Sequence, residues 1–202
     1  MQTLICIGDS LTEGADIPVG HTWPALAANA LSLKVVNGGI GGDTTGGMLS
    51  RFYPQVAAEK PAFVLIMGGT NDLWWGLDVN SILANLFSMV VQARHHGIAP
   101  VIGVPLPVDV TAARAGDFLP PWGGYARFTA KMEELLEALT RHATEREVAV
   151  VDLHRPFLDA KQQVRAELFL PDGLHPNTVG HRTIAKAIGA AFQQQFNFLP
   201  GP

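Results

Sequence analysis

The chain reads TLICIGDSLTEG at residues 3–14, where an apolar run is followed at once by a glycine-rich polar turn. Further short, mostly apolar runs rich in valine and isoleucine occur at residues 34–36, 63–67, 101–104 and 148–151. Continuous apolar runs of this length are typical of strands that are buried on both faces, as they are in a parallel sheet. We therefore expect five strands of one buried parallel sheet.

Helical patterns alternate with these runs. Apolar residues repeat at helical spacing within residues 79–90 and 128–139, and a last helix is expected over about residues 178–196. Strand–helix alternation along the whole chain predicts an α/β protein. The expected fold is a three-layer α/β/α sandwich with a central five-stranded parallel sheet, in a single domain of residues 1–202.

Composition and charge narrow the range of partners. The formal net charge is −4 and no run of lysine or arginine occurs, so we expect no nucleic-acid partner. The one cysteine, Cys6, cannot form an internal disulfide. No stretch approaches the ~20 apolar residues of a membrane span, and no signal peptide is recognisable. We therefore expect a cytoplasmic protein without stable membrane insertion.

Polar, glycine-rich segments directly follow the first three expected strands, at residues 8–14, 37–45 and 68–72. Because sites in parallel sheets lie at the carboxyl ends of the strands, these segments should open onto one edge of the sheet. The one long segment that reads as irregular is the proline-containing stretch 105–124. A loop of that length in a compact domain is usually functional or mobile, and we expect it to form a wall of the site.

Three residues in these segments can stabilise a developing oxyanion. Ser10 heads the first loop, where backbone N–H groups are free, and Gly42 carries a free N–H in the second loop. Asn71 in the third loop has a side-chain amide that can donate. Each has an alternative interpretation: Ser10 as a helix cap, Gly42 as part of a tight turn, and Asn71 as a turn former. A phosphate-binding loop is disfavoured because the motif G-x-x-x-x-G-K-[ST] is missing.

A carboxylate and an imidazole occur close together in Asp172-Gly-Leu-His175, just before the last expected helix. The two-residue gap lets one turn hold both groups, so that Asp172 can fix the tautomer of His175 and His175 can take a proton from Ser10. The alternative is a loop aspartate and a loop histidine that are neighbours without a joint role. His154, which follows the fifth strand, is the second candidate for the base.

Together these motifs resemble the four sequence blocks of the SGNH/GDSL hydrolase superfamily, in the family's order and at similar spacing. The blocks correspond to residues 8–11, to Gly42 within 37–44, to 69–72 and to 172–175. The resemblance implies a flavodoxin-like arrangement of the sheet and a cofactor-independent serine esterase, lipase or acylhydrolase. It implies no metal, and no cysteine/histidine cluster in the sequence has metal-ligand spacing.

The resemblance also implies roles for individual residues. Ser10 would be the nucleophile, and its own N–H, the Gly42 N–H and the Asn71 side chain would form the oxyanion hole. His175 would act as general base and then as general acid, oriented by Asp172. In some relatives a backbone carbonyl replaces this aspartate, so whether Asp172 is essential stays open.

The expected substrate is a small-molecule ester. We prefer small acyl or aryl esters, lysophospholipids or thioesters to carbohydrate acetyl esters, and a non-catalytic ligand-binding domain on the same fold is the alternative from another class. Trp74, Trp75 and Trp122 are candidates for lining an acyl or aryl pocket.

His181 is expected on a helix surface. The apolar tail 196–200 is expected to pack on the body or against another subunit, and the oligomeric state stays open.

Overall fold

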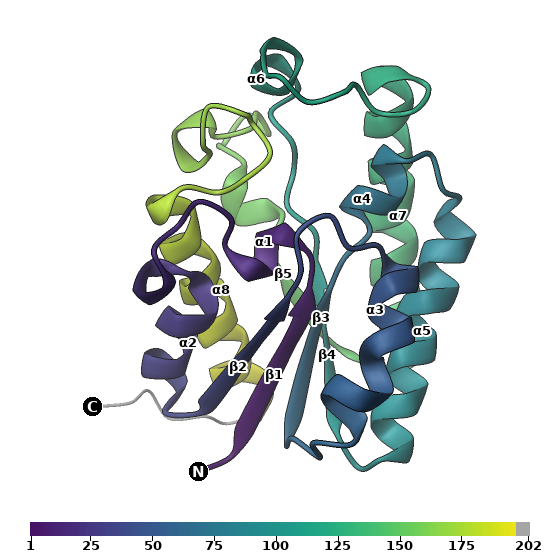
Figure 1. Ribbon diagram of the computed structural model, residues 1–202, viewed down its shortest axis with the longest axis vertical. Coiled ribbons are helices and arrows are strands. Elements are labelled where there is room, and N and C mark those ends of the chain that lie inside the picture. The colour runs from purple at the N-terminus through teal and green to yellow at the C-terminus, as the bar shows by residue number, and fades with distance from the viewer. Residues whose placement is uncertain (197–202) are drawn as a thin grey trace.

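A five-stranded parallel sheet forms the centre of the molecule, as the sequence predicts (Figure 1). The computed structural model describes residues 1–196. The strand order is β2-β1-β3-β4-β5. The strands are β1 (Thr3–Gly8), β2 (Lys34–Gly39), β3 (Phe63–Met67), β4 (Ala99–Val104) and β5 (Ala149–Asp152).

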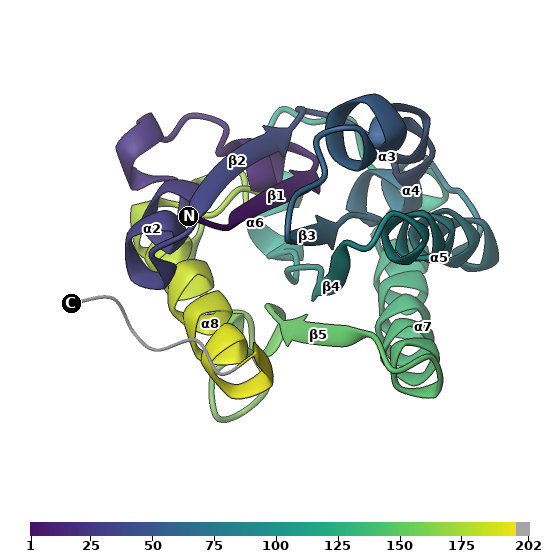
Figure 2. The same ribbon diagram turned by 90° about the horizontal axis from the view of Figure 1, so that it is seen from below.

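Helices cover both faces of the sheet, which gives the predicted three layers (Figure 2). One face carries α2 (Trp23–Leu31) and α8 (Thr178–Phe196). The other carries α3 (Thr45–Phe52), α5 (Val79–His95) and α7 (Gly124–Glu145). The shorter helices are α1 (Ser10–Glu13), α4 (Thr70–Trp74), α6 (Val110–Ala115), the 3-10 turns Val19–His21, Arg155–Phe157 and Ala166–Leu168, and the π-helical turn Tyr53–Ala57.

The apolar run in β1 is continuous because the strand is buried on both sides. Leu4 and Cys6 belong to the core under α2 and α8, whereas Ile5 and Ile7 belong to the core under α3, α5 and α7. All four side chains are at most 3% exposed. Side chains alternate between the faces of a strand, so both positions of the alternation must be apolar here.

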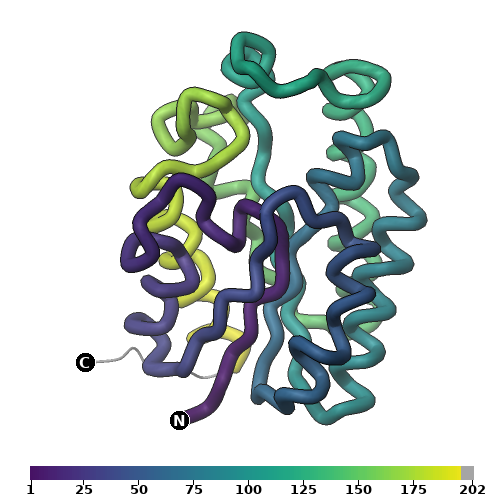
Figure 3. Tube along the Cα trace, in the orientation of Figure 1, coloured from purple at the N-terminus to yellow at the C-terminus, as the bar shows by residue number. Residues whose placement is uncertain are grey.

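The segment 105–124 is not irregular throughout, which corrects the expectation from the sequence. It contains helix α6, whose N-cap Asp109 accepts hydrogen bonds from the backbone N–H groups of Thr111 and Ala112 at 3.0 and 3.1 Å. The Asp109 N–H also donates to the Gly173 carbonyl at 2.9 Å. The segment therefore lies beside the turn that contains Asp172, above the carboxyl ends of the strands (Figure 3).

The apolar C-terminal tail is described only at its first residue. Phe196 packs edge-on against Phe63 and at a tilt against Phe192, with ring centroids 5.1 and 5.2 Å apart. Residues 197–200 of the expected tail contact lie outside the described residues. Within residues 1–196, no helix combines the length and the apolar character needed to cross a membrane.

Candidate active site

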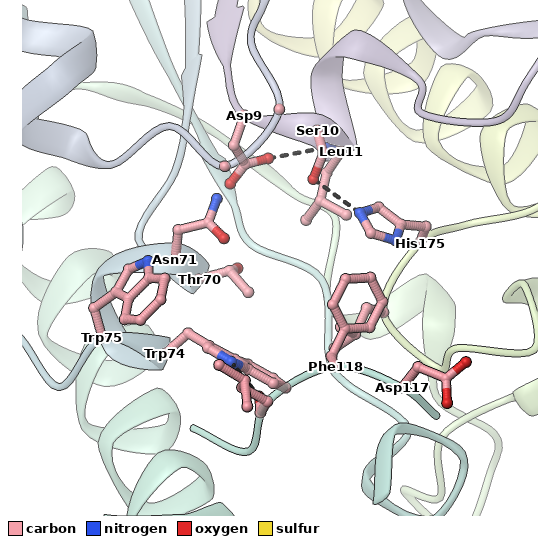
Figure 4. Close-up of a pocket in the computed structure, with 14 residues that line it drawn as sticks. Asp9, Ser10, Leu11, Thr70, Asn71, Trp74, Trp75, Asp117, Phe118 and His175 are labelled. Atoms are coloured by element: carbon pink, nitrogen blue, oxygen red, sulfur yellow. Dashed lines mark hydrogen bonds between the residues drawn. The ribbon is translucent and has the colours of Figure 1, made fainter. Parts of the chain in front are cut away.

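Ser10 is the first residue of α1 and lies two residues after Gly8, the carboxyl end of β1. The preceding residue, Asp9, caps the helix by accepting a hydrogen bond from the Leu11 N–H at 2.9 Å (Figure 4). Capping by Asp9 leaves the Ser10 side chain free to face the cavity, so the alternative interpretation of Ser10 as the helix cap is wrong. Burial raises the pKa of Asp9 to about 7.

His175 lies between Ser10 and Asp172. Its Nε2 is 2.9 Å from the Ser10 Oγ, and its Nδ1 is 2.6 Å from the Asp172 Oδ2 (Figure 4 shows the first contact). The other carboxylate oxygen of Asp172 accepts from the backbone N–H groups of Leu174 and His175 at 2.8 and 3.0 Å. One turn therefore holds the carboxylate and the imidazole in the order that a proton relay requires.

The Asp172 carboxylate is stabilised in its ionised form. Burial works to raise the pKa of Asp172, but the hydrogen bonds from the His175 ring and from the backbone N–H groups of His175 and Leu174 outweigh it and hold the pKa below its usual range. The turn also needs a glycine, because Gly173 has φ +67° and an added Cβ would lie 2.5 Å from the Asp109 carbonyl oxygen.

Gly42 and Asn71 line the same cavity as Ser10 and His175, which has a volume of about 540 Å³. Gly42 has φ +75°, a conformation that L side chains rarely adopt. The Asn71 Nδ2 donates one hydrogen to the Asp43 carbonyl at 2.9 Å. The amide has a second hydrogen, so Asn71 can still donate into the cavity.

Two of the three tryptophans named from the sequence line this cavity. Trp74 packs edge-on against Tyr125 and Phe128 and donates from Nε1 to the Leu119 carbonyl at 2.9 Å, and Trp75 is 59% exposed. Trp122 does not line the cavity in the described chain. Its side chain lies against Gly76, and its backbone N–H donates to the Trp74 carbonyl at 2.8 Å.

Residues that the sequence reasoning missed complete the cavity wall. Asp117, Phe118 and Leu119 come from the segment after α6, and Leu174 comes from the turn between Asp172 and His175. The Phe118 ring centroid lies 6.1 Å from that of His175 (Figure 4). The sequence did hold a signal for them. Phe118 and Leu119 are apolar residues of the segment 105–124, which was expected to form a wall of the site.

The two other histidines near the sheet edge have structural contacts. The His154 ring contacts the Pro105 carbonyl through Nδ1 at 3.0 Å and lines a separate hollow. His181 is 1% exposed, not on a helix surface as expected, and its Nδ1 accepts from the backbone N–H of Trp23 at 3.0 Å. Burial, and to a smaller extent the charge of His175, lower the pKa of His181 to about 4.

Residues 1–196 contain no group of three or more potential metal ligands of the histidine, cysteine, aspartate and glutamate types.

Known proteins share both the sequence pattern and the fold. The sequence model of the GDSL-like lipase/acylhydrolase family matches residues 6–183. An arylesterase of Vibrio mimicus is 29% identical over 192 residues, which cover 93% of this chain and 86% of that protein. Esterase TesA of Pseudomonas aeruginosa is 37% identical over 112 residues, which cover 52% of this chain and 56% of that protein. The solved structure of a Desulfitobacterium hafniense protein assigned to the lipolytic G-D-S-L family has a TM-score of 0.80 at 24% identity, and the match covers 95% of this chain and 99% of that one.

Proposed function

The chain belongs to the GDSL-like lipase/acylhydrolase family and hydrolyses esters, and we propose that the reaction runs through an acyl-enzyme on Ser10. One observation carries this proposal. The Ser10 Oγ, both ring nitrogens of His175 and the Asp172 carboxylate form a continuous chain with contacts of 2.9 and 2.6 Å. An imidazole held in this way can accept the serine proton as the hydroxyl attacks a carbonyl carbon.

The reaction has two halves. In the first, the Ser10 Oγ bonds to the ester carbonyl carbon while its proton moves to His175 Nε2, and the carbonyl oxygen becomes an oxyanion. The tetrahedral intermediate then collapses, the alcohol takes the proton from His175 as it leaves, and the acyl group stays on Ser10. In the second half, a water molecule loses a proton to His175 Nε2 as it attacks the acyl carbon. The bond from the acyl carbon to the Ser10 Oγ then breaks, the carboxylic acid leaves, and the Ser10 Oγ takes the proton back from His175.

Donors from three segments would stabilise the oxyanion: the N–H of Ser10 at the start of α1, the N–H of Gly42 in the loop after β2, and the second amide hydrogen of Asn71 in α4. The N–H groups of the first turn of a helix have no partners within that helix, so the Ser10 N–H is available. All three residues line one cavity. Donors fixed before the reaction stabilise charge that develops only in the transition state.

The cavity favours uncharged aryl or short acyl esters as substrates. Its larger apolar lining side chains are Leu11, Trp74, Trp75, Phe118, Leu119 and Leu174. Among the described residues that line it, the acidic ones are Asp9 and Asp117, and none is a lysine or arginine. An anionic substrate would therefore find no positive partner here. An apolar wall also offers few hydrogen bonds to the hydroxyl groups of a carbohydrate acetyl ester, which remains the alternative within the enzyme class.

A fluorophosphonate probe tests the assignment of the nucleophile, because it reacts with an activated serine. Mass spectrometry should locate the label on Ser10, and Ser10→Ala and His175→Ala should each abolish hydrolysis of p-nitrophenyl acetate. His154→Ala is the matched control and should keep wild-type kcat, since its ring contacts the Pro105 carbonyl and not Ser10. Label on another serine, or loss of activity in His154→Ala with retention in His175→Ala, would overturn the proposal.

A panel of neutral and charged esters tests the substrate class. Phenyl acetate and p-nitrophenyl butyrate should have higher kcat/KM than an ester with a carboxylate on its acyl chain and than an acetylated xylo-oligosaccharide. Higher kcat/KM for the acetylated sugar would support the alternative.

The cytoplasmic location stays a prediction from the sequence, which cell fractionation tests.

A further inference from the structure

Arg51 lies in the last turn of α3, and its side chain is 12% exposed. Its guanidinium is outside the cavity that holds Ser10. It donates from Nε to the Asp43 carboxylate at 2.8 Å and from Nη2 to the Gly8 carbonyl at 2.9 Å. Its Nη1 donates to the Gly38 carbonyl at 2.8 Å and to Gln55 Oε1 at 2.6 Å.

Three of the four acceptors of Arg51, Gly8, Gly38 and Asp43, belong to the segments that carry the proposed oxyanion donors. Gly8 ends β1, two residues before Ser10. Asp43 directly follows Gly42, and its carbonyl accepts the hydrogen bond from the side chain of Asn71. One planar cation therefore joins the segments of Ser10 and Gly42 directly, and reaches the third donor, Asn71, through a single residue.

Other hydrogen bonds also link these segments, from Asn37 to the Glu13 carbonyl and from Thr45 to the Asp72 carboxylate, but none of them involves Gly42. The Ile40 N–H donates to the Gly8 carbonyl at 3.1 Å, and the Asp43 N–H donates to the Ile40 carbonyl at 3.1 Å. Gly42 has no hydrogen bond of its own among the contacts of the described residues, and an added Cβ there would meet no atom within 4 Å. No neighbouring atoms therefore pack against Gly42 where a side chain would be. The direction of its N–H must be fixed by the hydrogen bonds of neighbouring residues.

The geometry of the guanidinium suits this task. Its N–H groups lie in one rigid plane, so acceptors held by them keep fixed relative positions. The ion pair with Asp43 is largely buried, with both side chains 12% exposed. A lysine would keep the positive charge, but its compact ammonium cannot hold Gly8, Gly38 and Asp43 in one plane.

We propose that Arg51 is a positioning residue that fixes the spacing between the oxyanion donors. The proposal rests on the acyl-enzyme mechanism on Ser10. Because oxyanion donors act on charge that develops in the transition state, a loosened Gly42 loop should lower kcat and leave KM nearly unchanged. A misplacement on the order of 1 Å costs roughly 100-fold in rate.

The test is Arg51→Lys, with kcat and KM for p-nitrophenyl acetate and the inhibition constant of a trifluoromethyl ketone. The hydrated or serine-bound ketone carries an oxyanion, so its affinity reports the oxyanion hole. We expect kcat to fall roughly 10- to 100-fold, KM to change by less than about threefold, and the ketone to bind more weakly by a factor similar to the loss of kcat. A role in folding alone would lower the melting temperature without weakening the ketone relative to the substrate.

Arg94→Lys is the matched control. Arg94 lies on α5 and also donates to backbone carbonyls, those of Arg146 and Glu147 at 2.9 and 2.8 Å, but outside the cavity. It should keep wild-type kcat and ketone affinity. Asp43→Asn breaks the ion pair and keeps the backbone carbonyl for Asn71, so it should repeat the pattern of Arg51→Lys with a smaller loss.

If Arg51→Lys does not fold, Asp43→Asn decides. The proposal is overturned if the folded variant of either residue keeps kcat and ketone affinity within about threefold of wild type, because removing one oxyanion donor costs roughly 100- to 1000-fold in kcat. It is also overturned if Arg94→Lys loses as much as Arg51→Lys. Failure of the underlying mechanism is recognised separately, because Ser10→Ala would then retain activity.

Discussion

Asp172→Asn tests the carboxylate of the relay most sharply. Asparagine keeps an oxygen that can accept from the Leu174 and His175 N–H groups, so the turn should persist. The amide that replaces Oδ2 would instead donate to Nδ1 of His175. The ring proton would then sit on Nε2, the atom that faces the Ser10 Oγ, and Nε2 could no longer accept the serine proton.

The magnitude follows from the 2.6 Å contact between Oδ2 and Nδ1. When His175 becomes a cation in the transition state, its charge and that of the Asp172 carboxylate are each spread over the whole group, so their centres lie further apart than the contacting atoms. At about 4 Å, two unit charges attract by about 4 kcal/mol at an effective dielectric constant of about 20. The Asp172 side chain is 20% exposed, so water weakens this attraction. A loss of about 2 to 4 kcal/mol corresponds to a fall in kcat of roughly 30- to 1000-fold.

Asp152→Asn is the control that the chain itself offers. Asp152 Oδ1 accepts from the backbone N–H groups of residues two and three positions later, His154 and Arg155, both at 3.0 Å. Asp172 forms the same turn, but only Asp172 also contacts an imidazole with its second oxygen. Steady-state kinetics on p-nitrophenyl acetate and thermal melts of both variants separate the effect on chemistry from the effect on the turn.

The expected result is a large loss of kcat in Asp172→Asn and wild-type kcat in Asp152→Asn, with similar small changes in melting temperature. A kcat for Asp172→Asn within about fivefold of wild type would refute the reasoning, since another acceptor would then have to hold Nδ1. That outcome would place this chain with those relatives in which the aspartate is dispensable.

Three further outcomes are expected. Asn71→Asp should lower kcat roughly 100- to 1000-fold, because a carboxylate cannot donate to the oxyanion; a near-native kcat would favour the role of a turn former. Burial raises the pKa of Asp9 from 3.8 to about 7, so the free energy of unfolding should fall as the pH rises across that interval, by about 4 kcal/mol at most. In Asp9→Asn, urea denaturation at several pH values should lack that part of the slope. Phe118→Ala should change the ratio of kcat/KM between p-nitrophenyl butyrate and acetate, and an unchanged ratio would remove Phe118 from the acyl pocket.

The sheet was predictable because its signal is local. A strand buried on both faces needs apolar residues at every position, and β1 and β3 meet that requirement with five buried residues each. The site at the sheet edge then follows from the rule that parallel strands present their carboxyl ends together. The Asp172–His175 pair was visible for the same reason, since both residues belong to one turn.

The pocket wall was harder to predict because it depends on where a long segment turns. Trp122 was a candidate because an aromatic residue of the segment 105–124 could line an acyl or aryl pocket. Instead, α6 and the hydrogen bond from Asp109 to the Gly173 carbonyl bring Phe118 and Leu119 over the cavity. The contacts of Arg51 could not be read from the sequence either. Two of its acceptors are backbone carbonyls, which every residue has, 13 and 43 positions away.

The choice between His175 and His154 shows where a local pattern stops being decisive. Both histidines follow an aspartate in a turn in which the carboxylate accepts the histidine's own N–H. His175 stands three residues after its aspartate, and its ring folds back onto the carboxylate. His154 stands two residues after its aspartate, and its ring reaches across to the Pro105 carbonyl. One residue of spacing sets which way the imidazole points, and the neighbouring chain then supplies the acceptor: a carboxylate that can balance a cation in one case and a neutral carbonyl in the other.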